Sequence, residues 1–154
     1  MSKKSIKSAP KLTISIIASE FNDEVISRML ASAKNTLMGS KKPQIRIKEV
    51  IRVPGCFEIP FTAKQLSKKT PKLDAIIALG VIIKGKTSQD KHLARACMTG
   101  LELCQMESGI PIGTGIITAN TRKQAMARTK GNLDRGKEAA LAAIHMARLN
   151  KTLK

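Results

Sequence analysis

The sequence lacks tryptophan and tyrosine and has only three phenylalanines among its 154 residues, so it offers few rings on which unpaired nucleic-acid bases could stack. Long hydrophobic runs are also missing, because no apolar segment approaches the roughly 20 residues that span a bilayer. Residues 1–10 are basic and polar, without the apolar centre of a secretory signal. These absences argue against a membrane protein and a secreted one. The three cysteines, an odd number, are typical of a reducing compartment, and we expect a cytoplasmic protein.

Acidic residues are scarce as well. The chain has 28 lysines and arginines against 11 acids, a net charge of +17. Such an excess attracts nucleic acid, acidic membranes or small anions, or it is a solvated surface that lines a cavity inside an oligomer. With 42% apolar residues the composition is globular. We expect a basic tail over residues 1–10 and one domain over residues 11–154.

Short apolar or alternating segments are separated by segments with helical spacing of apolar residues. In the first helix, over residues 22–38, Asn22 is a candidate N-cap and Gly39 a stop signal. The alternation predicts an α/β fold of three layers, flavodoxin-like, with a four-stranded, mainly parallel sheet and helices on both faces. The alternating strand over 45–53 is placed nearer an edge. The predicted strands are 11–18, 45–53, 74–80 and 110–118, and the other predicted helices are 58–66, 89–106, 121–128 and 136–149.

Ligands of such folds bind at the carboxyl ends of the strands, where two of the three phenylalanines fall. Phe21 and Phe57 at these ends suggest rings that stack on a flat ligand, although each ring could also plug the end of the sheet. Glu58 either complements a helix dipole or accepts hydrogen bonds from ligand hydroxyls. Cys56 has no histidine or basic residue near it in the sequence, which favours a small buried filler over a nucleophile.

Residues 80–87 (G-V-I-I-K-G-K-T) match the spacing of a nucleotide phosphate-binding loop between a strand and a helix. The β-branched residues 81–83 prefer extended backbone, which such a loop cannot use. The strand over 110–118 also has no acid to hold Mg²⁺, so nucleotide hydrolysis is disfavoured. A weaker prediction remains, because Gly85, Lys86 and Thr87 open a helix whose free N–H groups suit a phosphate.

Arg128 is a second candidate for contact with a phosphate. It ends the basic helix predicted over 121–128, where it is either a solvated or capping cation or a bidentate phosphate clamp. Lys130 and Arg135 add positive charge nearby. No metal site is predicted, because the two histidines lie far apart and two of the cysteines share an apolar helix face.

Several motifs occur together in one order along residues 12–149. The most specific is V-P-G-C-F-E-I-P over residues 53–60. The others are Glu20-Phe21-Asn22, then Asp74-Ala75 with Gly80, Ile83, Gly85 and Thr87, then Ala125-Met126-Ala127-Arg128, and finally residues 136–147. Together they resemble the 6,7-dimethyl-8-ribityllumazine synthase family of riboflavin biosynthesis. Residues 121–125 and the short segment before Arg135-Gly136 are closer to its archaeal branch than to the common bacterial pattern.

The resemblance implies a transferase that condenses 5-amino-6-(ribitylamino)uracil with 3,4-dihydroxy-2-butanone 4-phosphate. An imine forms, phosphate is eliminated, and the ring closes with loss of water to give 6,7-dimethyl-8-ribityllumazine. No metal or organic cofactor is implied, since holding two substrates in reacting geometry supplies much of the acceleration. The resemblance also implies a homopentamer, in some members built further into a sixty-subunit icosahedral shell, with each active site between two chains.

The family's site residues map onto positions already singled out. Phe21 would stack on the pyrimidine, while Asn22 and Glu58 would bind the ribityl hydroxyls. The phosphate would bind Gly85, Lys86, Thr87 and Arg128, with Lys130 and Arg135 as secondary cations. Arg135 stands where many members have lysine, and Thr114 where many have phenylalanine; the neighbouring chain would supply Thr114 and Arg128. Further contacts to the ring or the chain fall on Gly55, Cys56, Phe57, Val81, Ile82, Ile83 and Thr114.

One departure concerns the acid–base group. The family carries a histidine two positions after the residue matched by Thr87, and this sequence has Gln89, whose amide cannot take up a proton near neutral pH. His92 lies about one helical turn further on. General acid–base help is worth about 10²–10⁴-fold, so the sequence predicts a slow enzyme. The alternatives are a weakened paralogue that binds a ribityl ligand or serves as an assembly scaffold, and a basic nucleic-acid-binding protein.

Overall fold

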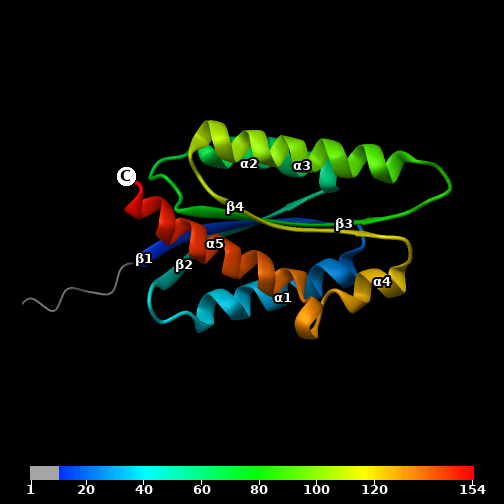
Figure 1. Ribbon diagram of the computed structural model, residues 1–154, viewed down its shortest axis with the longest axis horizontal. Helices are drawn as coiled ribbons and strands as arrows, with labels where there is room; N and C mark the ends of the chain where they lie inside the picture. The colour runs from blue at the N-terminus through cyan, green and yellow to red at the C-terminus, as the bar shows by residue number, and fades with distance from the viewer. Residues whose placement is uncertain (1–10) are drawn as a thin grey trace, which may run out of the picture.

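A computed structural model describes residues 11–154, so the predicted basic tail lies outside the described residues. Its four strands form one sheet in the order β2-β1-β3-β4, and every neighbouring pair is parallel. The predicted α/β fold is confirmed, and the sheet is wholly rather than mainly parallel (Figure 1). β2 is an edge strand, as its alternating sequence predicts. The strands are β1 (Lys11–Ser19), β2 (Gln44–Val53), β3 (Ala75–Ile83) and β4 (Ile112–Ala119).

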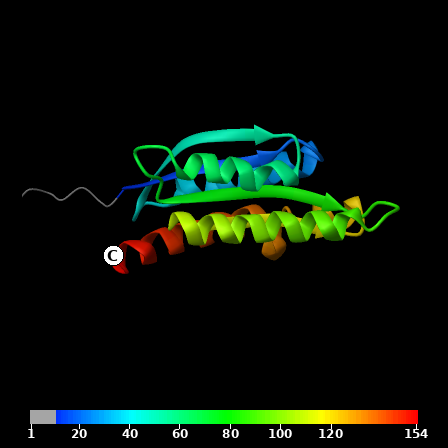
Figure 2. The same ribbon diagram turned by 90° about the horizontal axis from the view of Figure 1, so that it is seen from above.

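Helices cover both faces of the sheet, which gives the three predicted layers. α1 (Asp23–Gly39) and α5 (Arg135–Thr152) pack together on one face, with the short α4 (Arg122–Ala127) on the same side (Figure 1). α2 (Ile59–Ser67) and α3 (Gln89–Ser108) run side by side over the other face (Figure 2). Within residues 11–154, no helix combines the length and the apolar character that crossing a membrane requires.

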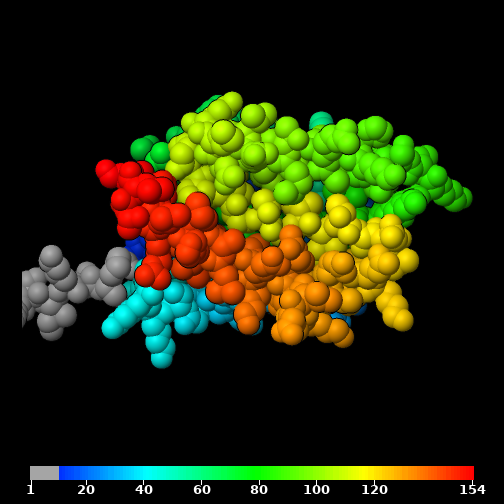
Figure 3. Space-filling model, in the orientation of Figure 1, coloured from blue at the N-terminus to red at the C-terminus, as the bar shows by residue number. Residues whose placement is uncertain are grey.

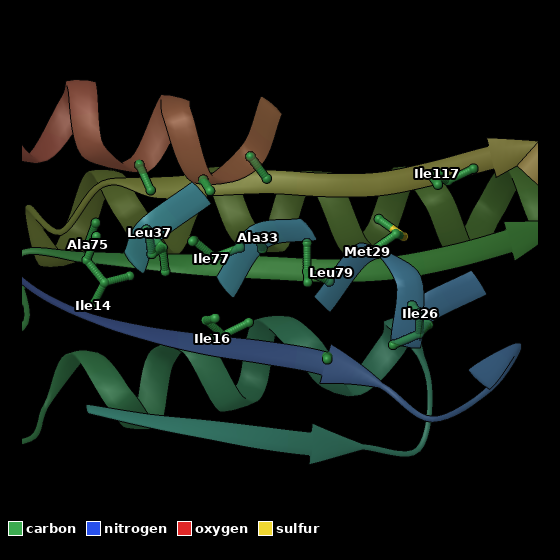
Figure 4. Close-up of a cluster of buried hydrophobic side chains, with 14 of the residues drawn as sticks. Ile14, Ile16, Ile26, Met29, Ala33, Leu37, Ala75, Ile77, Leu79 and Ile117 are labelled. Atoms are coloured by element: carbon green, nitrogen blue, oxygen red, sulfur yellow. The ribbon is translucent and has the colours of Figure 1, made fainter. Parts of the chain in front are cut away.

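The strands bury side chains on both faces because each face is covered by helices, as in other parallel sheets. Ile14 and Ile16 of β1 point to the α1 side, where they pack with Met29 and Leu37 (Figure 4). Ile17 points the other way, into the core under α2 and α3. Two apolar cores therefore hold the sheet from opposite sides and present its carboxyl end as a rigid edge.

α5 lies very close to its neighbours because small residues face them. A Cβ at Gly136 would come within 2.3 Å of the Met29 carbonyl oxygen, and one at Gly113 within 2.2 Å of the Ala139 carbonyl oxygen. Only hydrogen fits at these two positions. Alanines 139, 140, 143 and 147 of α5 are fully buried, which keeps the helix axis close to the sheet.

Some element boundaries differ from those predicted. β3 continues through Ile83 instead of ending at Gly80, so Val81, Ile82 and Ile83 are extended, as their β-branching predicts. The helix predicted from Glu58 begins at Ile59, because residues 56–58 form a 3₁₀ turn (η1, Cys56–Glu58) first. Asn22 occupies the N-cap position of α1, as predicted, and its side chain makes no cap hydrogen bond.

Candidate active site

The predicted site segments meet at the carboxyl end of the sheet (Figure 1). The Glu20 N–H donates to the Val53 carbonyl at 2.7 Å, and the Phe21 N–H donates to the Pro54 carbonyl at 3.2 Å. These bonds fasten the turn after β1 to the turn after β2. The Lys84 N–H donates to the Ala119 carbonyl at 2.8 Å and fastens the loop after β3 to the end of β4. Segments that are far apart in the sequence thus form one edge.

A cavity of about 330 Å³ at this edge is lined by Phe21, the end of β3 and the loop that follows it. Phe21 is 72% exposed, so the alternative in which its ring plugs the end of the sheet is wrong. Because the ring stands at the cavity, its face is available to a flat ligand. The lining residues are Phe21, Val81, Ile82, Ile83, Gly85, Thr87, Gln89, Asp90 and Leu93.

A second cavity, of about 540 Å³, adjoins the first. Gln89 and Leu93 line both, so the Gln89 amide stands where the two cavities meet. Phe57 is 69% exposed at the second cavity, and again the ring does not plug the sheet. His92 faces this second cavity and is absent from the lining of the first. The lining residues are Gly55, Cys56, Phe57, Glu58, Gln89, His92, Leu93 and Ala96.

Glu58 and Asn22 take part in the local backbone of the site. The Gly55 N–H donates to Glu58 Oε2 at 2.9 Å, which holds the carboxylate against the turn that follows β2. Asn22 has a left-handed backbone with φ of 61°, a conformation that asparagine tolerates better than most residues. Its Nδ2 donates weakly to the Val81 carbonyl at 3.5 Å. Both side chains therefore stand beside the cavities that they are predicted to serve.

Cys56 is buried and contributes to the lining of the second cavity. Burial raises the pKa of its thiol to about 11, and contacts with the Val81 backbone and the Ser19 side chain only partly offset that effect. A thiol with this pKa carries almost no nucleophilic thiolate at neutral pH, which agrees with the small buried filler predicted. The Cys56 thiol also leaves no room for a side chain at Gly80, because a Cβ there would lie 2.5 Å from Cys56 Sγ.

The predicted phosphate loop is exposed at the start of α3. Gly85, Lys86 and Thr87 precede the first turn of this 20-residue helix, where backbone N–H groups and the helix dipole favour an anion. The hydroxyl of Thr87 accepts a long hydrogen bond of 3.4 Å from the Gln89 N–H. The structure therefore keeps this loop open at the edge of the first cavity.

Arg128 lies at a third cavity, of about 650 Å³, together with Arg95 and Gln124. Asp90 lines both this cavity and the first, so the two cavities adjoin at this residue. Asp90 Oδ1 is buried and has no hydrogen-bond partner within residues 11–154. The sequence reasoning missed Asp90, and the only available signal was its position in the first turn of the helix, next to Gln89.

Five predicted residues line none of these three cavities within a single chain: Asn22, Lys86, Thr114, Lys130 and Arg135. Thr114 lines a separate cavity of about 270 Å³ between α3 and β4. Arg135 pairs with Glu138 at 2.8 Å, and its backbone N–H donates to the Arg128 carbonyl at 2.9 Å. Lys130 is exposed on the turn between α4 and α5. Nowhere in the described part of the chain do three histidine, cysteine or acidic side chains gather as ligands for a metal ion.

Comparison with known proteins places this geometry in context. The sequence model of a family described as 6,7-dimethyl-8-ribityllumazine synthase matches residues 11–151. The 6,7-dimethyl-8-ribityllumazine synthase of Halorhodospira halophila (strain DSM 244 / SL1) is 36% identical to the chain over 140 residues. The match covers 90% of this chain and 88% of that protein.

Proposed function

Because this chain belongs to the 6,7-dimethyl-8-ribityllumazine synthase family, we propose roles for the residues at its sheet edge within that family's reaction. The chain is a transferase of riboflavin biosynthesis with lumazine synthase activity. Its two substrates are the family's ribitylaminouracil and phosphorylated butanone. The proposal concerns where each substrate binds, which groups act on it, and what Gln89 does to the rate.

The aminouracil ring binds in the first cavity, against the face of Phe21. The observation that carries this assignment is the exposed Phe21 ring at a cavity whose other wall is the extended end of β3, because peptide groups there can meet a flat heterocycle. The ribityl chain then runs past Gln89 into the second cavity. Glu58 stands there with Phe57, and a carboxylate suits the hydroxyl donors of a polyol.

The phosphate of the second substrate binds to the loop before α3. Gly85, Lys86 and Thr87 offer backbone N–H groups, an ammonium and a hydroxyl. The Arg128 guanidinium supplies bidentate hydrogen bonds and positive charge to the phosphate as it leaves. Lys130 and Arg135 add longer-range attraction. With both substrates held at one edge, the amine reaches the ketone and orientation supplies much of the acceleration.

Proton transfer is the weak step of this site. Imine formation and ring closure both move protons, and the Gln89 amide at the junction of the two cavities can donate or accept hydrogen bonds but cannot change its protonation state. His92 lines the second cavity, on the ribityl side, and is the other candidate for proton transfer. We therefore propose an enzyme that binds and orients its substrates normally and turns over slowly.

The active unit is a homopentamer, which in some family members builds further into an icosahedral shell. Thr114 and Arg128 of one chain complete the site of the next, and Thr114 supports this because it lies apart from the first two cavities of its own chain. Large apolar side chains exposed on α3 and α2, Met98, Leu103, Met106 and Phe61, also support a covered interface. A monomer in static light scattering would contradict this assembly.

Two finer assignments belong to the same proposal. Residues 121–125 and the short segment before Arg135-Gly136 support the archaeal-like branch of the family. All three cysteines are unpaired thiols, which supports a reducing cytoplasmic compartment.

The experiment that tests the function is the initial rate of lumazine formation, followed by absorbance with both substrates present. We expect turnover above the uncatalysed background and a rise of about 10²-fold in Gln89→His, since general acid–base help typically lies between 10² and 10⁴. Gln89→Asn, which keeps an amide, is the matched control and gains nothing.

His92→Gln separates the two candidates for acid–base action. If His92 carries protons, this variant slows the enzyme by 10²-fold or more; we expect a change below about threefold. Absence of turnover in both the wild type and Gln89→His would refute the proposed roles and leave ligand binding or scaffolding. Isothermal titration with a ribityl ligand would then distinguish those two.

A further inference from the structure

The end of the sheet opposite the site carries a cluster of lysines that the synthase reaction does not use. The parallel strands all begin there, and the connections α1–β2 and α2–β3 and the end of α5 lie together at that end (left in Figures 1 and 3). We call this surface the basic pole. It comprises the exposed residues Lys11, Lys41, Lys42, Lys68, Lys72 and Lys154.

Acids near the basic pole are already neutralised by other lysines. Lys69 pairs with Glu49 at 3.3 Å. Lys151 pairs with Asp74 at 3.3 Å, and Lys64 pairs with Glu107 at 2.5 Å. Within residues 11–154, none of the six lysines of the basic pole forms a salt bridge. Their charge is therefore uncompensated and projects into solvent.

The distribution of these lysines favours an extended polyanion over a small anion. They come from the start of β1, two connections and the chain end, and none of them lines a cavity described above. Lysine ammonium groups act as point charges without the planar fork that reads a base edge. They suit a repeating array of phosphates, whose counterions are released on binding.

Aromatic side chains are absent from the basic pole. Phe21 and Phe57 lie at the opposite end of the sheet and Phe61 in the first turn of α2, so no ring is available to stack on an unpaired base. We propose that the basic pole binds duplex nucleic acid through its phosphate backbone, without reading sequence. This inference is independent of the roles proposed for the active site.

An anionic membrane is the other large polyanion, and the surface suits it less well. The exposed apolar side chains nearest this end come from three places: Met38 of α1, Met106 of α3, and Leu149 and Leu153 at the end of α5. Membrane-surface binding uses one amphipathic helix face with aromatic or leucine anchors beside its lysines. Leu149 and Leu153 share one helix end here, but no aromatic anchor lies beside them and none of the six lysines of the basic pole belongs to that helix.

The test uses the full chain with a short duplex RNA and a duplex DNA of the same sequence, in fluorescence anisotropy between about 50 and 200 mM salt. We expect both duplexes to bind at low salt and to dissociate as salt rises. The triple variant Lys42→Gln, Lys68→Gln, Lys72→Gln removes up to three phosphate contacts. The slope of log K against log salt should then fall by about 3, and affinity at low salt by about tenfold or more.

A matched variant, Lys84→Gln, Lys123→Gln, Lys137→Gln, removes the same charge away from the basic pole and should bind nearly as the wild type does. Circular dichroism and the lumazine rate of the pole variant confirm that it folds and works. No duplex binding at low salt, equal losses in the two variants, or binding to phosphatidylserine vesicles in place of duplexes would each overturn the proposal.

Discussion

The two ends of the sheet carry different chemistry on one rigid body. The carboxyl end has exposed rings, adjoining cavities and a glycine loop, and the amino end has unpaired lysines and no ring. All strands point the same way, so every strand ends at one edge and begins at the other. A parallel sheet can therefore place substrate binding at one end and leave the other for a different partner. Acids also follow the strand ends, at Glu20, Asp23, Glu24, Glu58 and Asp90.

Both ends of the sheet depend on the close packing of α5 against α1 and the sheet. A substitution that disturbs this packing should therefore lower the stability of the whole domain. In Gly136→Ala the new methyl group meets the Met29 carbonyl oxygen at 2.3 Å, which forces α1 and α5 apart. We expect the free energy of unfolding to fall by about 3 kcal/mol, measured by urea denaturation. Gly39→Ala is the control, because a Cβ there has nothing within 4 Å. A stable Gly136→Ala protein would show that α5 shifts easily.

The buried thiol at the carboxyl end should make stability fall at alkaline pH. Cys56 has a pKa of about 11 in the folded protein against 9.0 as the ordinary value, because burial disfavours the thiolate. The folded state keeps the proton longer, so the stabilisation is complete below pH 9 and is lost as the pH rises to about 11. The difference between the two pKa values corresponds to about 3 kcal/mol of unfolding free energy. Denaturation midpoints measured across this range should change less in Cys56→Ala.

Cys104 lies near the carboxyl end of α3, toward the amino end of the sheet, and is a second buried thiol. Burial raises the pKa of its thiol too, while the nearby Lys64 ammonium lowers it. Cys104→Ala should therefore flatten the alkaline loss of stability less than Cys56→Ala does. Equal flattening in the two variants would mean that the Lys64 ammonium does not offset the burial of the Cys104 thiol.

Loss of the arginine clamp should affect the rate and leave the opposite end untouched. Arg128→Ala removes the charge-assisted hydrogen bonds that we propose to the phosphate, and we expect kcat/KM for the phosphorylated substrate to fall by about 30-fold, or about 2 kcal/mol. Arg128→Lys restores little, because an ammonium cannot bind in the same bidentate way. Lys42→Ala at the basic pole is the control and keeps the full rate. An equal fall in kcat/KM in Arg128→Ala and Lys42→Ala would contradict the separate roles of the two ends of the sheet.

The smallest effect is expected from exposed ion pairs at the two ends. Arg52 donates to the Ser19 carbonyl at 3.1 Å and to Asp23 Oδ1 at 2.5 Å, beside the turn that carries Phe21. Arg52→Ala should raise KM for the uracil substrate a few-fold with kcat unchanged, because the turn loosens. Lys64→Ala, which breaks the pair with Glu107, should leave both constants unchanged. Steady-state kinetics should show the rise in KM in Arg52→Ala only, and an equal rise in Lys64→Ala would contradict the prediction.

Much of the fold could be read from local patterns. The β-branched runs around Ile14 and Ile77 and the helical spacing of Val25, Met29 and Ala33 predict the elements, and their alternation predicts a parallel sheet. The strand direction then places Phe21, Glu58 and Gly85 at one edge. These inferences succeed because burial on both faces of a sheet produces a run of apolar residues that is visible within a few neighbouring positions.

Other features depend on contacts between distant residues. Nothing in the sequence around Gly136 indicates that the Met29 carbonyl, 107 positions earlier, lies against it. Nothing around Asp90 indicates that this residue lines two cavities. The exposure of Phe21 and Phe57, which decides between a ring for a ligand and a plug for the sheet, likewise depends on how the elements pack.

Hydrophobic periodicity is a local property of the chain, and it was therefore enough to predict which elements form, their alternation and the residues near the strand ends. The tertiary structure alone decided which cavities adjoin, where Gln89 stands between them, and that lysines from distant loops meet in the basic pole. Those facts arise from parallel strands that start together and end together, and from helices seated at distances set by backbone-to-backbone contact.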